Sequence, residues 1–311
     1  MADFDFGNEQ PFEQTITNNI EFSDANNKNI TKTEATTNKA QGLSHEELKD
    51  PNKINVTIAD KKTPIIILYG PPSSGKTMTL VRLTRFLGEA GYRVSPIKTF
   101  RPSYDDNYKK ICSEFDYMIN ETDAARSTER INFMLVEVLK NGKRLCQILE
   151  APGEYYFDKK NPTAKYPNFI NTILNGDNRK IWCILIEPDW EDESDRKNYV
   201  TRITSLKQRM RPIDKVIFLF NKIDMTPFVI SRGRVNIAEA RREVGENLYR
   251  GIFVPFKNVN PITSFFKEYN CDFVPFQTGD YTESEDGYTY QEGPREYPAA
   301  LWNKIYNLIK G

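Results

Sequence analysis

The stretch of sequence that decides the fold runs from Pro64 to Thr77 and reads PIIILYGPPSSGKT. Its first half is a short β-branched run, which is typical of a strand buried on both faces of a sheet. Its second half, Gly70–Thr77, fits the pattern GxxxxGK(S/T), and apolar residues continue at helical spacing from Met78 to Leu87. Because glycines and a helix N-terminus present backbone N–H groups, this order of strand, loop and helix predicts a polyphosphate-binding site.

Two side chains of this loop carry specific chemistry. We expect Lys76 to act catalytically by bringing a full positive charge to the β- and γ-phosphates, and the Thr77 hydroxyl to ligate Mg²⁺. The remaining nucleotide contacts expected in the loop and at the start of the helix come from Gly70, Ser73, Ser74, Gly75 and Met78. None of these residues distinguishes ATP from GTP.

A second motif distinguishes the two bases. Val216–Phe220 (VIFLF) predicts another buried strand, and it runs directly into Asn221-Lys222-Ile223-Asp224. The Asp224 carboxylate can accept from guanine N1–H and the 2-amino group together, an arrangement that adenine cannot reproduce. We expect Asn221 to brace the loop and contact the base, and the stem of Lys222 to cover the ring. GTP or GDP is therefore the predicted ligand.

The two motifs resemble those of the P-loop GTPases of the translation-factor-related class, the group that contains Ras-like proteins. Between them, the strand-like runs 131–139 and 143–149 flank Asn141-Gly142, a strong hairpin signal, and Glu150-Ala151-Pro152-Gly153-Glu154 follows. The resemblance implies that the Gly153 N–H senses the γ-phosphate and that Glu150 holds the metal through water. The chain departs from the class by having Glu150 in place of Asp. It also has Glu154, our candidate for orienting the attacking water, where Ras-like proteins have Gln.

The resemblance also implies a switch threonine that ligates Mg²⁺ and contributes to catalysis. Thr128, which lies 22 residues before Glu150, is the candidate, and Thr122 is the alternative. A helix cap is the alternative interpretation of either residue.

Two further sets of site residues follow from the same resemblance. Gln277-Thr278-Gly279, after a predicted strand over 271–276, would form the last base-contacting loop, with Thr278 as the contact. Three arginines are candidates for a catalytic arginine from this chain, although solvated charges are the simpler interpretation. They are Arg101, Arg126 and Arg130.

Strands and helices alternate along the rest of the chain. The further predicted elements are a strand at 182–187 and helices at 195–210, 237–249 and 297–310. This order predicts an α/β fold, the three-layer P-loop NTPase fold of Ras-like topology, with a mostly parallel sheet, one antiparallel hairpin strand and insertions. The insertions fall at 92–127, 154–178, 250–270 and 280–296, and residues 54–58 (INVTI) predict an edge strand. The phosphate loop, the EAPGE variant and these insertions also resemble bacterial GTPases of the double-GTPase and conflict-system families.

Composition predicts where the domain begins. The 311 residues carry 43 basic and 43 acidic side chains, yet residues 1–60 hold 11 acidic and 5 basic ones. Asn- and Thr-rich residues 1–50 offer little to bury, so we expect an acidic disordered tail there and a single GTPase domain over 51–311. Four phenylalanines of the tail predict a short peptide that docks on a protein partner, or simply a solvated arm. They are Phe4, Phe6, Phe12 and Phe22.

Composition also excludes several classes of protein. A single histidine and four cysteines without a CxxC pair argue against zinc sites, redox motifs and histidine-based catalysis. Zero net charge argues against a nucleic-acid partner, and Phe265, Phe266 and Trp302 lie in apolar contexts typical of a core. With an acidic N-terminus, no apolar run of about 20 residues and no basic amphipathic helix, we expect a cytoplasmic protein that does not bind membranes.

The sequence therefore predicts a Mg²⁺-dependent GTPase that acts as a switch, with loops 100–128 and 150–178 ordered by GTP and engaging protein partners. One alternative is a scaffold that holds nucleotide with little or no hydrolysis. A second is an ATPase of another P-loop class, in which Ile184-Leu185-Ile186-Glu187 would end a Walker-B-like strand. Nothing in the sequence indicates an oligomeric state.

Overall fold

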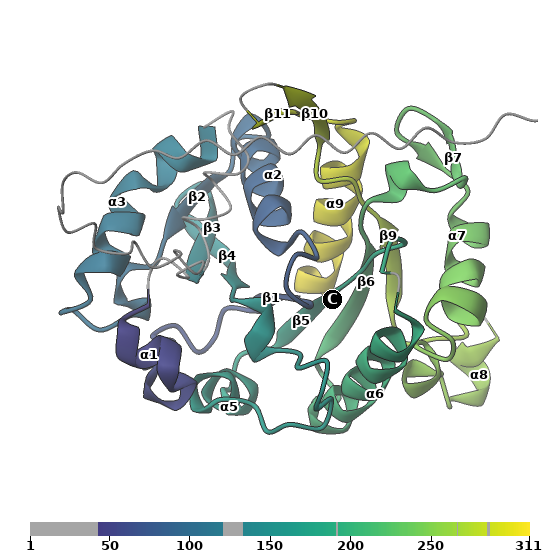
Figure 1. The fold of residues 1–311 in the computed structure, drawn as a ribbon, viewed down its shortest axis with the longest axis horizontal. Coiled ribbons are helices and arrows are strands. Elements are labelled where there is room, and N and C mark those ends of the chain that lie inside the picture. The colour runs from purple at the N-terminus through teal and green to yellow at the C-terminus, as the bar shows by residue number, and fades with distance from the viewer. Residues whose placement is uncertain (1–42, 121–132, 191, 266, 285–286) are drawn as a thin grey trace, which may run out of the picture. The chain divides into compact units, whose positions relative to one another are not determined.

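The computed structural model describes residues 43–120, 133–190, 192–265, 267–284 and 287–311 (Figure 1). The predictions for residues 1–42 lie outside these ranges, and so do those for Thr122, Arg126, Thr128, Arg130 and Phe266. The described part belongs to one unit of the chain, residues 38–311.

A seven-stranded sheet in the order β2-β3-β4-β1-β5-β6-β9 forms the centre of this unit. Strands β1, β4, β5, β6 and β9 pair in parallel, β3 pairs antiparallel with β4, and β2 pairs antiparallel with β3. The strands are β1 (Ile65–Tyr69), β2 (Arg93–Pro96), β3 (Met134–Lys140), β4 (Lys143–Glu150), β5 (Lys180–Ile186), β6 (Lys215–Phe220) and β9 (Asp272–Pro275). Two small antiparallel pairs lie outside the sheet, β7 (Val229–Ser231) with β8 (Arg234–Val235) and β10 (Asp280–Ser284) with β11 (Gly287–Gln291).

Helices cover both faces of the sheet (Figure 1). On one side, α2 (Lys76–Glu89) packs between α3 (Asp106–Asn120) and α9 (Glu296–Lys310); on the other lie α5 (Asn168–Asn175) and α6 (Glu193–Arg209). Shorter helices are α1 (His45–Lys49), α7 (Ile237–Glu243), which a π-helical turn extends to Leu248, and α8 (Pro261–Ser264). The predicted three-layer P-loop NTPase fold with a mostly parallel sheet is confirmed.

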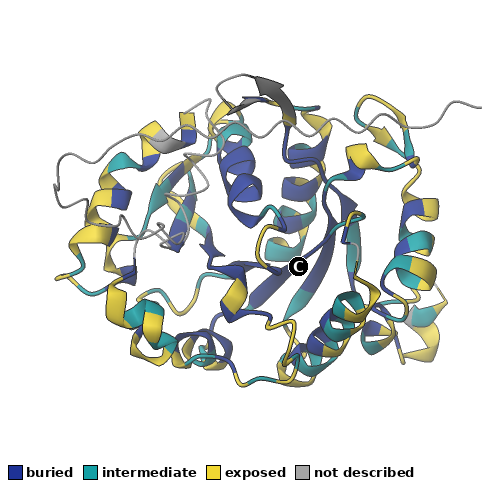
Figure 2. Cartoon of the chain, in the orientation of Figure 1, coloured by how far each residue is buried: buried dark blue, intermediate teal, exposed yellow. Residues whose placement is uncertain are grey.

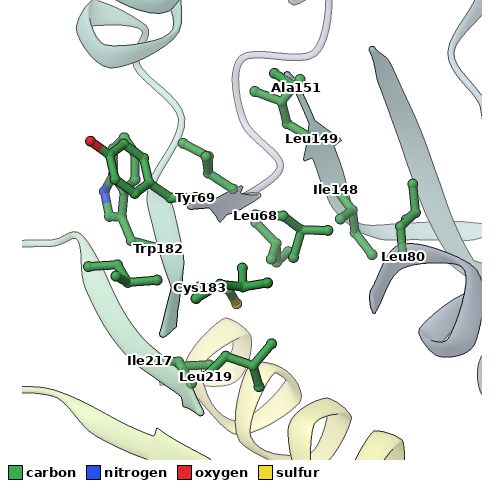
Figure 3. Close-up of a cluster of buried hydrophobic side chains, with 14 of the residues drawn as sticks. Leu68, Tyr69, Leu80, Ile148, Leu149, Ala151, Trp182, Cys183, Ile217 and Leu219 are labelled. Carbon is green, nitrogen blue, oxygen red and sulfur yellow. The ribbon is translucent and has the colours of Figure 1, made fainter. Parts of the chain in front are cut away.

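The core lies where the central strands meet these helices, and the exposed residues are concentrated on the outer surfaces of the helices (Figure 2). Every residue of β1 is buried, as the β-branched run predicts. Tyr69 of β1 packs against Trp182 of β5 on one face of the sheet. Leu68 lies on the other face, together with Ile148 of β4 and Leu80 of α2 (Figure 3). The strand that precedes the glycine-rich loop is therefore held rigidly on both faces.

The predicted hairpin between β3 and β4 is confirmed in its turn chemistry. Asn141 and Gly142 both have positive φ, at 50° and 74°, which suits the primed turns that join two antiparallel strands. The β4 strand then delivers Glu150 at its last position.

The predicted edge strand at 54–58 is wrong. Residues 54–58 form no strand, and the two edges of the seven-stranded sheet are β2 and β9. Ile54 is buried, Val56 and Ile58 pack partly against the core, and Thr57 N–H donates to the Phe100 carbonyl at 2.8 Å. The alternation of apolar and polar residues over 54–58 therefore reflects an extended segment that packs one face against the core.

The exposure of Phe265 and the position of the first helix differ from what the sequence predicts. Phe265, which was expected in the core, is 88% exposed at the end of α8, whereas Trp302 of α9 is buried as predicted. Ordered structure also begins before residue 51, because a capping box between Ser44 and Glu47 starts α1. The apolar context of Phe265 in the sequence lies within one short loop, which the core does not enclose.

Candidate functional site

Four of the sequence motifs meet at one edge of the sheet, the carboxyl ends of its parallel strands. Strand β1 leads into Gly70, β4 ends at Glu150, β6 leads into Asn221 and β9 leads into Phe276. Since these strands run parallel, their following loops gather at the same edge, which is where open α/β sheets bind ligands. We refer to it as the carboxyl edge.

The phosphate loop is wound tightly over this edge. Ser73 and Gly75 have φ of 63° and 84°, and Gly75 is the residue from which α2 starts. The hydroxyl of Ser74 donates to the Pro71 carbonyl at 2.9 Å, and Lys76 Nζ donates to the same carbonyl at 2.7 Å. Lys76 therefore folds back along its own loop.

Lys76 is a buried cation with carboxylates nearby. Its side chain is 5% exposed, and burial lowers its pKa, while Glu150, Glu154 and Glu187 act in the opposite direction. A polyphosphate bound here would add negative charge beside a cation that has already lost most of its water, which strengthens their interaction.

Thr77 and Glu150 lie in direct contact, since the Thr77 hydroxyl donates to Glu150 Oε1 at 3.0 Å. Glu150 is fully buried, and burial raises its pKa to about 8 against the opposing effects of Lys76 and Thr77. Its other oxygen, Oε2, has no hydrogen-bond partner among the described residues. A hydroxyl beside a desolvated carboxylate with an unused oxygen fits Mg²⁺, which prefers oxygen ligands and keeps several waters. The longer side chain of Glu150 reaches the hydroxyl of Thr77.

Gly153 lies directly against the phosphate loop. A Cβ atom at this position would lie 2.2 Å from the backbone nitrogen of Pro72 and 2.3 Å from the carbonyl carbon of Pro71. Only glycine permits this approach between the EAPGE motif and the loop. The next residue, Glu154, is exposed, and its charge still acts on Lys76 and Glu150.

One side chain connects the Asn221–Asp224 motif to the Gly70–Thr77 loop. Asn221 Nδ2 donates to the Ser74 carbonyl at 3.0 Å, and a Cβ at Gly75 would lie 2.3 Å from that nitrogen. Thr278 also approaches the loop, because its methyl carbon would lie 3.2 Å from the same Cβ. The structure thus brings Asn221 and Thr278 against residues 74–75.

Asp224 and Lys222 differ in how they are held. Asp224 as a whole residue is exposed, but its carboxyl group is partly surrounded by protein. This partial burial, and then the charge of Asp280, raise its pKa. The Lys222 ammonium pairs with Glu187 and Asp189, both at 2.8 Å, at the end of β5. Glu187, the residue that would end a Walker-B-like strand, is therefore engaged with the base motif, while Thr77 contacts Glu150.

One buried arginine was not singled out by the sequence. Arg82 of α2 donates to the carbonyl of Gln277 and, at 2.5 Å, to that of Pro294, and its guanidinium lies 5.8 Å from the Phe276 ring centre. It is 2% exposed. A charged residue inside the apolar stripe of the predicted helix was the available signal, because such a residue needs a buried partner.

Arg101 fits neither of its two interpretations, a catalytic arginine or a solvated charge. Its guanidinium pairs with Glu47 at 2.6 Å and Asp105 at 2.8 Å and donates to the Asn55 carbonyl at 2.9 Å. It is buried over the Phe133 ring, so it is neither a solvated charge nor free to reach a phosphate. It joins α1 to the segment that precedes α3.

The described residues hold no cluster of three or more histidine, cysteine, aspartate or glutamate side chains that could bind a metal by itself. All four cysteines are free and buried. Within the same residues, no helix is both long and apolar enough to cross a lipid bilayer.

No protein-family model matches the chain, and a search of curated proteins found no match. Several solved structures are similar in fold. The GTP-bound signal recognition particle receptor SRb/SRX complex from Chaetomium thermophilum is 15% identical with a TM-score of 0.42, over 79% of this chain and 98% of that one. Nucleolar GTP-binding protein 1 from Plasmodium falciparum is 13% identical with a TM-score of 0.39, over 82% and 90%. The GDP- and phosphate-bound Ski7 GTPase-like domain from S. cerevisiae is 14% identical with a TM-score of 0.38, over 86% and 52%. At these values we base no inference about this chain on the neighbours.

Proposed function

We propose that the chain binds a guanine nucleotide with Mg²⁺ and hydrolyses GTP to GDP and phosphate as a conformational switch. The observation that carries the proposal is the hydrogen bond from Asn221 to the Ser74 carbonyl. It joins a guanine-type motif to a phosphate loop at one edge of the sheet. A nucleoside triphosphate could then contact both motifs at once.

On the phosphate side, Lys76 would neutralise the β- and γ-phosphates, and Thr77 and Glu150 would hold Mg²⁺. The metal would supply further charge neutralisation during phosphoryl transfer. Gly153 would donate its N–H to the γ-phosphate, and Glu154 would orient the attacking water. Thr128 stays a prediction for the switch threonine, since it lies outside the described residues.

On the base side, Asp224 would accept from guanine N1–H and the 2-amino group, with Thr278 and Asn221 completing the pocket wall. Partial burial and then the charge of Asp280 raise the pKa of Asp224. Two donors from guanine would act in the opposite direction by stabilising the carboxylate.

Switching would involve the segments on either side of the EAPGE motif. Segments 100–128 and 150–178, which contain the helices α3 and α5, would change with the nucleotide state and engage protein partners, and the N-terminal phenylalanines would supply a docking peptide. We further propose a cytoplasmic location.

A second function, a scaffold that holds nucleotide without turnover, is favoured by Glu154, because a carboxylate beside Lys76 and Glu150 adds negative charge near the transferred phosphoryl group.

Titration of the purified chain with fluorescent GTP, GDP and ATP, combined with measurement of phosphate release, tests the proposal. We expect preference for guanine nucleotides, a requirement for Mg²⁺ and release of phosphate. Preference for ATP would instead support another P-loop class, and tight GTP binding without release would support the scaffold. Failure to bind any nucleotide would overturn the assignment of the site.

A further inference from the structure

The surface that carries this inference is the loop formed by residues 257–270, away from the carboxyl edge. The loop connects a 3₁₀ turn at Val254–Phe256 to the amino end of β9. Its neck is closed by backbone hydrogen bonds from Asn258 N–H to the Glu268 carbonyl at 2.7 Å and from Asn270 N–H to the Phe256 carbonyl at 2.6 Å. A closed neck gives the loop a defined shape.

Large apolar side chains project from this loop into solvent. Val259 is 91% exposed, Ile262 is 77% exposed and Phe265 is 88% exposed; we call these three residues the apolar tip. The sequence between Asn258 and Lys267 contains no acidic or basic residue. Exposed apolar side chains of this size, gathered on one loop, mark a surface that is covered by a partner.

Beside the loop lies a cavity of about 510 Å³ whose walls carry Lys207, Lys215 and Lys267 together with Phe256. Two carboxylates also line it, and both are already engaged. Asp214 is 3% exposed and paired with Arg211, and Asp272 lies 3.2 Å from Lys267 and 3.4 Å from Lys304. Glu268 is exposed nearby and offsets one positive charge.

Charge and hydrophobicity therefore combine on one surface. Lys207 lies 5.7 Å from the Phe256 ring centre, which connects the basic wall to the neck of the loop. An uncharged apolar tip next to a cavity lined by the half-buried Lys207 and Lys215 matches the two layers of a lipid surface, in which anionic head groups overlie hydrocarbon. A protein pocket would need its own ring of acidic residues around an apolar centre to match both features.

We propose that the apolar tip and the lysine-lined cavity form a docking surface for membranes that contain anionic lipid. The tip inserts Val259, Ile262 and Phe265 below the head groups, and Lys207 and Lys215 contact the lipid phosphates. This departs from the expectation of no membrane partner, which considered only helices. The surface lies at the amino end of β9, away from the carboxyl edge, so the proposal does not depend on nucleotide binding.

Co-sedimentation of the full chain with vesicles tests the proposal. One set of vesicles is phosphatidylcholine alone, and the other contains about 30% phosphatidylserine, which gives the surface a negative potential. We expect binding to the second set, little binding to the first, and weaker binding as salt rises.

Two double variants separate the parts of the surface. I262S with F265S removes most of the apolar tip, and K207E with K215E reverses the basic wall. Each should weaken vesicle binding by about tenfold or more, because both insertion and charge contribute. Circular dichroism and nucleotide binding should be unchanged in both, since all four side chains lie outside the carboxyl edge.

Matched controls come from elsewhere in the chain. Tyr104 and Ile230 are 77% and 67% exposed, so Y104S with I230S removes a similar amount of exposed apolar surface. Lys109 and Lys110 on α3 supply the charge-reversal control. We expect both controls to bind like the original chain. Absence of binding to anionic vesicles, or undiminished binding by the tip variant, would overturn the proposal; the first outcome would leave a protein as the occupant of the tip.

Discussion

The phosphate half and the base half of the proposed site are held in place in different ways. In the phosphate half, which comprises residues 70–77 with Glu150 and Gly153, buried groups pack directly on one another. The base half comprises residues 221–224 and 277–279. There Asp224 is exposed, and Arg82 holds the 277–279 loop by donating to the Gln277 carbonyl. Shape should therefore limit substitutions in the first half, whereas hydrogen-bonding chemistry should decide ligand choice in the second.

The largest effect is expected from Lys76→Ala. Removing a buried cation that would face two phosphate groups costs about 4 kcal/mol of binding, which corresponds to about a thousandfold loss of GTP affinity. Titration with fluorescent GTP measures this. Lys110→Ala, at an exposed lysine of α3, is the control and should bind normally. Unchanged affinity in Lys76→Ala would remove the phosphate half from the site.

Gly153→Ala tests whether shape limits the phosphate half. The new Cβ would collide with the backbone of Pro71 and Pro72, so the EAPGE motif or the loop must move. A displacement of about 1 Å near the reacting groups lowers turnover by about a hundredfold. Phosphate release under single-turnover conditions measures this effect, and preference for guanine over adenine should persist.

The matched control for that variant is Gly88→Ala in α2, where a Cβ meets nothing within 4 Å. It should leave turnover unchanged and raise stability by about 0.5–1 kcal/mol, because alanine is the better helix former. Equal turnover in Gly153→Ala and Gly88→Ala would contradict the contact-based view of the phosphate half.

Asp224→Asn tests the chemistry of the base half. The amide presents a donor where the carboxylate accepts, so GTP affinity should fall by about thirtyfold while affinity for xanthosine triphosphate rises. Competition between the two nucleotides measures the exchange. A variant that keeps its guanine preference would show that another residue reads the base.

Arg82→Lys tests the support behind the base half. Lysine keeps the charge but lacks the planar guanidinium group that donates to the Gln277 and Pro294 carbonyls together. GTP affinity should therefore fall by about fivefold. Thermal unfolding and titrations with GTP and ATP are the measurements. A loss of stability with unchanged GTP affinity would assign Arg82 to the fold alone.

Asp60→Asn changes a residue outside both halves and gives the smallest effect on nucleotide binding. Burial raises the pKa of Asp60, but hydrogen bonds from Thr63, Lys62 and Arg144 outweigh it and hold the pKa far below its ordinary value of 3.8. The folded state therefore gains stability from the carboxylate above pH 3.8, and this gain is lost as the pH falls below that value.

In Asp60→Asn, the free energy of unfolding at pH 7 should fall by about 1–2 kcal/mol, since charge-assisted hydrogen bonds are lost. Its stability should depend less on pH between 4 and 2, as urea titrations at several pH values would measure. GTP and ATP affinities should match those of the original chain. A change of nucleotide preference would show that the two halves are coupled to the opposite edge of the sheet.

Local patterns predicted the parts of the molecule whose chemistry is contained within a few residues. The strand and loop at 64–77, the Asn141-Gly142 turn and the strand that ends at Phe220 each carry a complete signal, and the structure places them as expected. Features set by distant partners could not be predicted in this way. Residues 54–58 pack beside Phe100 outside the sheet, and Phe265 is 88% exposed; both outcomes depend on how distant parts of the chain are arranged.

The same limit applies to charged residues. The identity of Arg101 or Lys222 says nothing about which carboxylates fold beside it, so their pairs with Glu47 and Glu187 could not be predicted from the sequence. Arg82 differs, because an arginine within an apolar helical stripe already requires a buried acceptor. Its partners, the carbonyls of Gln277 and Pro294, lie 195 and 212 residues further along the chain, so identifying them required the structure.

The hydrogen bond between Asn221 and Ser74 spans 147 residues of sequence. Contacts of such separation form late, because the intervening chain must first be closed into a loop. A ribosome-bound or truncated chain that ends before β6 can contain the complete glycine-rich loop and still lack the brace behind it. Nucleotide binding would then report completion of the fold, and a ligand that binds only the finished state would protect that state from unfolding.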